Sequence, residues 1–388
     1  MEKSRSLLSR TLRGVAHTGG KALLETQRAW RRHVIAAEIR KELTLKHRQW
    51  CSGFEPPPES REAARRFLAR NFNGYDDLQN HELYWRVTGR FDSAFIPAEI
   101  FYCKIEPALN AMPYVSVLTD KNNLYSLSMA PYLPEPVLHI VRGDLYLPGF
   151  VRIADTELAR VFASQDEEFI VKPAVEHGAG RDMQVMDGPT ASAFISTVLS
   201  DHLARRKADW VIQRFLTQCP EMARFNATSV NTFRILMMTT ESGVIELSSF
   251  LRTGRSGMRV DNYTMGGIAA GIENGRLRGR GLVRDWYFLD VHPDSGVPFT
   301  GELPAYHEAL ELCRKLQRSL PWFDLVSWDV AVDAKHQPRI IEFNVASQGI
   351  ETHQLNNGPL FGPEGGTTLS LLLKRLAVMP PDPQYATS

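Results

Sequence analysis

The sequence has few cysteines for its length: four among 388 residues, scattered along the chain and without a CxxC pair. This spacing matches neither a disulfide framework nor the common zinc-binding patterns, so it predicts reduced thiols and a cytoplasmic protein without a zinc site. No apolar run approaches the roughly 18 residues that a membrane-spanning helix needs, and no secretory signal is recognisable.

Two common phosphate-binding loops are also missing. No GxxxxGK[ST] pattern occurs, and no GxGxxG pattern follows a predicted strand. The composition is otherwise that of an ordinary folded protein, with 43% hydrophobic and 23% charged residues, which excludes wholesale disorder.

The net charge is small, at +1, but it is unevenly distributed. Residues 1–50 contain 12 Lys and Arg against 4 Asp and Glu, a net charge of +8, which leaves −7 for the rest. The basic segment is interpreted as a solvated helical extension, or as a segment that binds an acidic partner or a membrane surface. A mitochondrial presequence is a further alternative. No specific nucleic-acid binding is expected.

Prolines and changes of pattern predict the domain organisation. The stretch "GFEPPPES" (53–60) marks a boundary, and a helix over 59–72 is predicted to start at Ser60. Four regions follow: a basic helical extension at 1–58, an N-terminal α/β region at 59–118, and two larger regions at 119–212 and 213–380.

Strand and helix patterns then alternate irregularly. Single strands are predicted at 168–174 and 210–216, and hairpins at 232–254, turning at Ser242–Gly243, and at 325–345. Helices are predicted at 189–207, 302–319 and 367–378, and short α/β elements between 90 and 118. Because no strict βαβ order appears, the fold class is α+β, or mixed α/β.

The second predicted hairpin contains acidic residues inside a strand. If its turn has four residues, Asp333 faces Pro338 and Asp329 faces Glu342, and Asn344 shares their face by alternation. Two carboxylates so close repel each other unless a cation lies between them. All-oxygen ligands suit magnesium or manganese. Salt bridges to arginines are the alternative, and the hairpin alone leaves both open.

Other residues are consistent with a bound phosphate. Lys172 ends a predicted strand and precedes Gly178 and Gly180, so it could neutralise phosphate charge while the glycine loop covers it. A surface lysine is the alternative. The strand that ends in Gln213–Leu216 has an edge that could hydrogen-bond an adenine through its backbone.

In this order, these parts resemble the ATP-grasp superfamily, and most closely its sugar-transfer-associated family. The resemblance spans residues 119 to about 357. It is carried by "TDKNNLYSLSMAPYLPEP", "FIVKPAVEHGAG", "WVIQRFLTQ", "SVNTFRILM", "SFLRTGRSGMRVDNYTMGGI" and "SWDVAVDAKHQPRIIEFN".

The resemblance implies an ATP-grasp fold, in which two α+β subdomains, 119–212 and 213–380, grip ATP after a helical N-terminal region. It also implies roles for residues of this chain. The nucleotide-binding residues would be Lys121, Lys172, Gly178, Gly180, Gln213, Arg214, Phe215 and Leu216. The metal ligands would be Asp329, Glu342 and Asn344, and the catalytic residues Arg234, Arg252 and Asn344.

The implied activity is that of a magnesium-dependent ligase. It would phosphorylate a small-molecule carboxylate with ATP and let an amine attack the acyl-phosphate, releasing ADP and phosphate. A kinase acting on a hydroxyl or phosphate acceptor is the alternative on the same fold, and a non-catalytic nucleotide-binding protein is a third reading. The sequence identifies neither the acid nor the amine.

Overall fold

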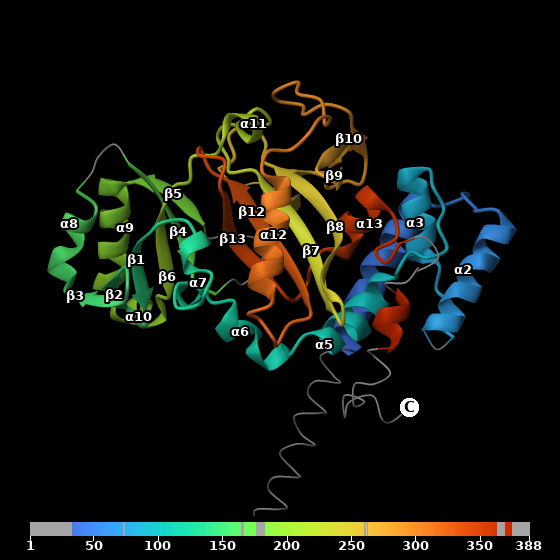
Figure 1. Ribbon diagram of the computed structural model, residues 1–388, viewed down its shortest axis with the longest axis horizontal. Coiled ribbons are helices and arrows are strands. Elements are labelled where there is room, and N and C mark those ends of the chain that lie inside the picture. Colours follow the sequence, from blue (N-terminus) through green and yellow to red (C-terminus); the bar gives the residue numbers. More distant parts are fainter. Residues whose placement is uncertain are drawn as a thin grey trace, which may run out of the picture. The chain divides into compact units, whose positions relative to one another are not determined.

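The computed structural model describes residues 33–72, 74–163, 167–175, 183–259, 261, 263–362 and 369–374 (Figure 1). The chain forms two compact units, Met1–Ala108 with Phe361–Ser388, and Leu109–Leu360. Across the described ranges, no helix combines the length and apolar character that crossing a bilayer requires.

The first unit is helical in its described part. Its helices are residues 33–50, α2 (Pro58–Asn71), α3 (Gln79–Thr88), α4 (Ala98–Ile100), a π-helical turn at Phe101–Ile105, and α5 (Glu106–Leu109). The helical part of the basic extension is confirmed for residues 33–50, whereas residues 1–32 lie outside the described part.

Two expectations for this region are wrong. The helix predicted over 59–72 is confirmed as α2, but it begins at Pro58, after Pro57, and not at Ser60. A proline suits the first helical turn because its missing N–H would have no partner there. Short helices also replace the α/β elements expected between 90 and 118. Ile100, Phe101 and Ile105 are fully buried within these helical turns, and this burial outweighs the strand-like appearance of the short apolar runs.

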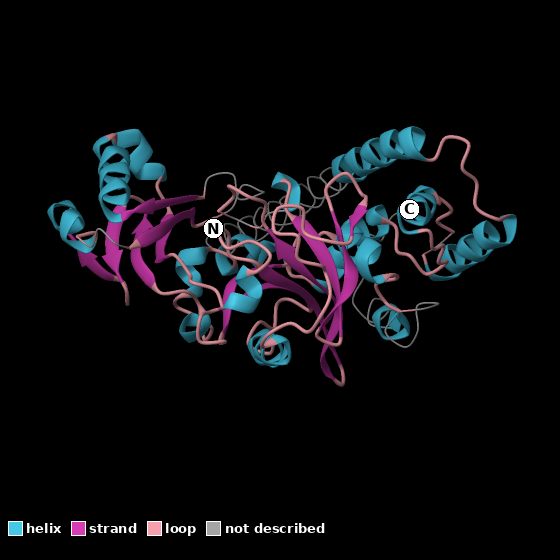
Figure 2. Cartoon of the chain, turned by 90° about the horizontal axis from the view of Figure 1, so that it is seen from above, coloured by secondary structure: helices cyan, strands magenta, loops and turns pink. Residues whose placement is uncertain are grey.

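The second unit contains two antiparallel sheets, which Figure 2 shows as separate groups of strands. The six-stranded sheet has the order β3-β2-β1-β6-β4-β5. Its strands are β1 (Pro136–Val141), β2 (Asp144–Leu147), β3 (Val151–Ile153), β4 (Glu168–Pro173), β5 (Gln184–Asp187) and β6 (Trp210–Arg214).

Helices complete the core of the six-stranded sheet. They are α8 (Leu158–Val161), α9 (Gly188–Ser200) and α10 (His202–Lys207). Ile195 of α9 is buried against Phe169 and Val171 of β4. The single helix predicted at 189–207 is therefore two helices, since Asp201 leaves the helical conformation and caps α10 through the amides of Leu203 and Ala204.

The seven-stranded sheet has the order β11-β10-β9-β8-β7-β12-β13. Its strands are β7 (Thr232–Thr240), β8 (Gly243–Thr253), β9 (Ile268–Glu273), β10 (Arg276–Leu282), β11 (Phe288–Leu289), β12 (Leu325–Val332) and β13 (Pro338–Asn344). Both predicted hairpins are confirmed as β7–β8 and β12–β13. The first turn lies at residues 241 and 242, because Thr240 pairs with Gly243.

The remaining helices of this unit are α6 (Val115–Leu118), α7 (Lys121–Leu124), α11 (Pro220–Ala223), α12 (Tyr306–Gln317) and α13 (Ile350–Asn357). Short 3₁₀ turns lie at Met112–Tyr114, Ala130–Tyr132, Asp155–Glu157 and Tyr263–Met265. The helix predicted at 302–319 is thus α12, and that at 367–378 is helical where it is described, at 369–374.

The two faces of the seven-stranded sheet differ in polarity. One face carries Phe233, Trp328 and Phe343, which join the main core together with residues of α12. Figure 1 shows α12 across this sheet. Because side chains alternate along a strand, Arg234 and Asp329 lie on the opposite face, which is polar.

The register of β12 and β13 places Asp329 opposite Glu342, as predicted, but by a different route. Val332 pairs with Pro338, so the turn has five residues, where four were predicted, and Asp333 does not face Pro338. A turn of that length alone would put Asp329 and Glu342 on opposite faces. The register shifts once more between Asp329 and Val330, and this bulge restores their pairing.

Two glycines of the six-stranded sheet provide a matched test of close backbone packing. Gly143 and Gly149 have φ of 81° and 79°, but a Cβ at Gly143 would lie 2.4 Å from the Arg205 carbonyl oxygen, whereas at Gly149 it would meet nothing within 4 Å. We expect Gly149→Ala to lower the free energy of unfolding by about 1 kcal/mol through backbone strain, and Gly143→Ala by roughly 3 kcal/mol. Urea denaturation measures both, and equal losses would contradict the packing argument.

Candidate active site

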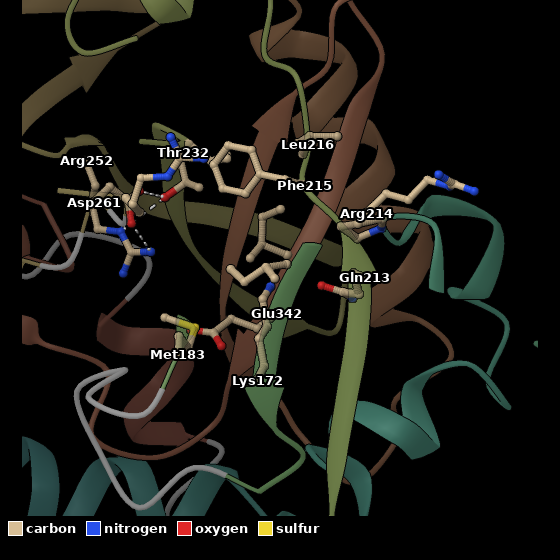
Figure 3. Close-up of a pocket in the computed structure, with 15 residues that line it drawn as sticks. Lys172, Met183, Gln213, Arg214, Phe215, Leu216, Thr232, Arg252, Asp261 and Glu342 are labelled. Atoms are coloured by element: carbon tan, nitrogen blue, oxygen red, sulfur yellow. Dashed lines mark hydrogen bonds and ion pairs between the residues drawn. The ribbon is translucent and has the colours of Figure 1, made fainter. Parts of the chain in front are cut away.

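A pocket lies between the two sheets of the second unit, as the close-up in Figure 3 shows. Fifteen residues line it: Pro134, Ile170, Lys172, Met183, Gln213, Arg214, Phe215, Leu216, Val230, Thr232, Arg252, Arg259, Asp261, Ile341 and Glu342. The structure therefore brings together seven of the residues proposed from the sequence, namely Lys172, Gln213–Leu216, Arg252 and Glu342. Gly178 and Gly180 lie outside the described residues.

The two predicted lysines approach the carboxylate end of this pocket from different elements. Lys172 is buried near the end of β4, and Lys121 is buried at the start of α7. The Lys121 amide donates to the carbonyl of Ala174, 2.8 Å away, which ties α7 to the segment after β4. The Lys121 Nζ lies 3.6 Å from a Glu342 oxygen, although Lys121 does not line the pocket.

The pocket also contains a buried amide. Gln213 is 3% exposed, and its Nε2 donates to the Tyr125 hydroxyl at 2.5 Å. That hydroxyl donates to the Pro134 carbonyl at 2.6 Å. The Gln213 Oε1 is buried and, within the described ranges, has no hydrogen-bond partner. A buried acceptor without a partner costs free energy, which a donor on a ligand would recover.

The residues after Gln213 present a different surface. The Arg214 side chain forms ion pairs with Glu135 and Glu167 and points away from the pocket in Figure 3. The Arg259 guanidinium lies 4.5 Å from the centre of the Phe215 ring. Phe215 therefore lines the pocket as a flat apolar side chain held from one side, whereas the Arg214 charge is already neutralised.

A row of charged residues crosses the polar face of the seven-stranded sheet. Arg234 pairs in register with Asp329, which pairs with Glu342 on the next strand. The Arg234 Nε and Nη2 donate to the two Asp329 oxygens at 2.8 and 2.5 Å. The Arg252 Nη2 lies 3.2 Å from one of the same oxygens. Asp329 is fully buried, so both arginines compensate a carboxylate that water does not reach.

Asp261 and Thr232 join this network and were not predicted as site residues. Asp261 is buried, accepts from the Thr232 hydroxyl and lies 3.2 Å from the Arg252 Nη2. Burial raises the pKa of the Asp261 carboxyl, while Arg252 opposes that rise. In the sequence, Asp261 stands in the loop stretch "RVDNYTMGG", where no periodic pattern shows which residues face a site.

The charges also act on Arg234. Burial alone lowers the pKa of a guanidinium, but the charge and hydrogen bonds of Asp329 outweigh it and raise the pKa of Arg234 above its usual value. Arg234 is therefore held as a cation beside Asp329.

The proposed metal ligands are close together but partly engaged. The Asn344 Nδ2 lies 3.5 Å from an Asp329 oxygen, which confirms that Asn344 shares this face. Two carboxylates and an amide suit magnesium by their chemistry. Of the three, Glu342 lines the pocket, whereas Asp329 forms the arginine salt bridges that the sequence left as the alternative.

The chain matches the model of one protein family, described as sugar-transfer associated ATP-grasp, over residues 102–364. No curated protein matches. Among solved structures, the ATP-grasp ligase PsnB, complexed with a phosphomimetic variant of minimal precursor, Mg and ADP, is 13% identical, with a TM-score of 0.38. That comparison covers 69% of this chain and 61% of PsnB.

Two further structures are similar at the same level. D-cycloserine synthetase DcsG is 13% identical, with a TM-score of 0.41, and the comparison covers 69% of this chain and 73% of DcsG. The L-amino acid ligase from Bacillus licheniformis is 11% identical, with a TM-score of 0.36, and the comparison covers 69% of this chain and 49% of that ligase. The chain spans less than two thirds of the length of PsnB and of the L-amino acid ligase.

We expect the buried Asp329 to make Arg234 important for stability. Arg234→Met keeps the bulk but leaves the carboxylate with Arg252 alone, so the free energy of unfolding should fall by about 3–5 kcal/mol. Arg318→Met, at an exposed arginine just after α12, is the matched control and should change it little. Urea denaturation measures the free energy of unfolding of both variants. Similar small losses would show that Arg252 alone compensates the Asp329 charge.

Proposed function

Because the chain belongs to the sugar-transfer-associated ATP-grasp family, we propose that it is an ATP-dependent ligase. It joins a carboxylate to an amine through an acyl-phosphate and releases ADP and phosphate. The observation that carries the proposal is the pocket between the sheets, where Lys172, Gln213 and Glu342 converge. The family description refers to sugar transfer and leaves the acid and the amine open.

In this proposal, Gln213 and Phe215 hold the adenine. The Gln213 Oε1 is a buried acceptor without a partner in the described part of the chain, which suits the exocyclic amine of adenine. Phe215 and Ile341 supply apolar lining for the base. Arg214 then contributes to adenine binding through its backbone, because its side chain forms ion pairs with Glu135 and Glu167.

Lys172 and Lys121 neutralise the phosphates. Both side chains are buried, so their charges act with little screening by water. The Lys121 Nζ is 3.6 Å from a Glu342 oxygen, so this lysine lies beside a carboxylate that would hold the cation, where the phosphate oxygens would also bind. Gly178 and Gly180 remain predicted as the loop that covers the phosphates.

Glu342, Asp329 and Asn344 are the residues that would hold a magnesium ion. When bound, this ion supplies positive charge that stabilises the charge moving to the leaving ADP. Glu342 reaches the pocket without rearrangement, whereas Asp329 must share its oxygens with Arg234 and Arg252.

Arg252 is the residue best placed to exchange partners. Its single contact to Asp329, at 3.2 Å, is longer than those of Arg234, and it also touches Asp261 and lines the pocket. In the proposed reaction, Arg252 turns from Asp329 to the γ-phosphate or acyl-phosphate. Arg234, with its two shorter bonds, stays on Asp329 and positions it.

The role of Lys172 leads to a direct test. Lys172→Met removes the charge that faces the phosphates, so ATP turnover should fall by about 100-fold while the free energy of unfolding changes little. Lys121→Met should act in the same direction. Lys207→Met, at an exposed lysine at the end of α10, is the control. Normal turnover in a folded Lys172→Met protein would remove Lys172 from the mechanism.

The reaction class is tested with hydroxylamine. ADP release is measured against a panel of carboxylic acids, with and without amines, and hydroxylamine should replace the amine and trap the activated acid as a hydroxamate. The physical reason is that an acyl-phosphate is attacked readily by a small, strong nucleophile. ADP release with one hydroxyl-bearing acceptor, and no hydroxamate from any acid, would favour a kinase.

A further inference from the structure

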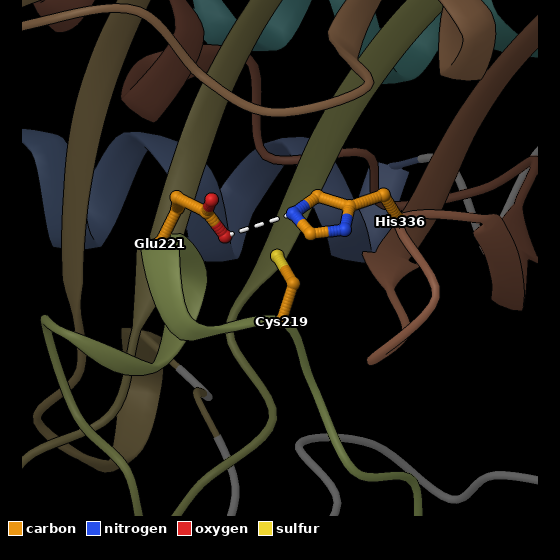
Figure 4. A group of neighbouring side chains, drawn as sticks. All are labelled: Cys219, Glu221 and His336. Atoms are coloured by element: carbon orange, nitrogen blue, oxygen red, sulfur yellow. Dashed lines mark hydrogen bonds and ion pairs between the residues drawn. The ribbon is translucent and has the colours of Figure 1, made fainter.

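A second cluster of metal-binding side chains lies apart from the nucleotide pocket. The Cys219 Sγ, a Glu221 carboxylate oxygen and a His336 ring nitrogen all lie within 4.8 Å of one another. Figure 4 shows the sulfur pointing to the gap between the carboxylate and the imidazole. None of the three residues lines the pocket between the sheets, so the proposed ligase reaction does not explain them.

Backbone hydrogen bonds hold the two segments that carry this cluster side by side. The Cys219 amide donates to the Val332 carbonyl at 3.0 Å, and the Ala334 amide donates to the Thr217 carbonyl at 2.9 Å. The segment after β6 is therefore attached to the turn between β12 and β13. The close approach of Cys219 and His336 follows from this attachment and does not depend on flexible side chains alone.

The turn itself is also well defined. An Asp333 carboxylate oxygen accepts from the amides of Lys335 and Gln337, each at 2.9 Å. His336 between them has a φ of 57°, in the left-handed region that few residues adopt. This conformation aims its ring at Glu221, whose oxygen lies 3.0 Å from the His336 Nε2.

We propose that Cys219, Glu221 and His336 bind a zinc ion, with the fourth position left to water. A thiolate, a carboxylate and an imidazole form a ligand set that suits Zn²⁺ and not Mg²⁺, which prefers oxygen alone. The two negative charges also balance the ion. In a tetrahedral zinc site the ligand atoms lie about 3.4–3.6 Å apart. The cluster needs only small side-chain shifts to reach that spacing from its present distances, which extend from 3.0 Å to at most 4.8 Å.

Exposure allows the ion to enter. The side chains of Glu221 and His336 are 53% and 50% exposed, whereas Cys219 is fully buried beneath them. A zinc ion can thus approach from solvent through the carboxylate and the imidazole and reach the sulfur behind them. Zinc would bind deprotonated sulfur, so the buried thiol becomes a ligand only when the metal is present.

The bound ion would join two segments that matter for the pocket. Cys219 and Glu221 follow the pocket-lining residues Gln213–Leu216, and His336 lies in the turn of the hairpin that carries Asp329 and Glu342. Zinc would therefore stabilise the connection between the nucleotide-facing segment and this hairpin. The inference stands whether or not the protein is a ligase, since it rests on these three side chains and their backbone.

The test uses the full chain, treated with a chelator and then titrated with Co²⁺ or Zn²⁺ without ATP. Bound Co²⁺ should show the near-ultraviolet charge-transfer absorption of a cobalt–thiolate bond, and Zn²⁺ should remove it by displacement. Cys219→Ser should abolish the band, and Cys51→Ser, at a cysteine of the other unit, should retain it. The band reports sulfur ligation, so metal on Asp329 and Glu342 does not contribute.

Affinity and stability provide the second readout. His336→Asn suits the left-handed backbone and removes the imidazole, so it should weaken zinc binding by more than about tenfold. His307→Gln, at an exposed histidine of α12, should not. At a free zinc concentration of about 100 times its Kd, zinc should raise Tm by roughly 5–10 °C in the unaltered protein and not in Cys219→Ser. Absence of the cobalt–thiolate band, or a band that survives Cys219→Ser, would overturn the proposal.

Discussion

The buried carboxylate of Asp329 constrains the whole seven-stranded sheet. It lies in the middle of β12, a strand whose residues are all buried, and it has no access to water. A lone charge there would cost several kcal/mol, so its two arginine partners are a condition of the fold. Those partners come from β7 and β8, and they reach Asp329 only in the observed strand order and register.

This constraint divides the sheet into two faces with different tasks. On one face, aromatic and aliphatic side chains and α12 form the core. On the other face, two arginines on β8 and β7 lie beside two carboxylates on β12 and β13, and Glu342 of β13 reaches the pocket. The result is a polar surface that is held rigidly by the apolar layer beneath it, which is what a phosphate-binding site requires.

The same charges explain why the proposed site can respond to a ligand. Arg252 is shared by Asp329 and Asp261, so its partner can change without leaving a charge uncompensated. An incoming phosphate would attract Arg252, and a cation would take its place beside Asp329. Gln213 would bind a ligand differently. Its buried Oε1 accepts no hydrogen bond from the described residues, so a donor on the ligand can take that place.

The sequence by itself determined the local elements and much of the pocket. Alternating and apolar runs predicted β4, β6 and both hairpins, and the order of Lys172, Gln213–Leu216 and Glu342 predicted residues that the structure brings into one pocket. Only the tertiary structure decided the rest. The pairing of Asp329 with Glu342 depends on a bulge that compensates a five-residue turn, and a bulge has no periodic signal.

Long-range contacts were likewise beyond the sequence. Arg252 meets Asp261 through a loop, and His336 meets Cys219 across 117 positions because backbone hydrogen bonds join their segments. The spacing of cysteines along the chain predicted no zinc site, because it does not show that the fold brings Cys219 close to Glu221 and His336. Local patterns reflect the period of a helix or strand. The convergence of distant side chains depends instead on strand order, register and turn length, and these are set only when the chain folds.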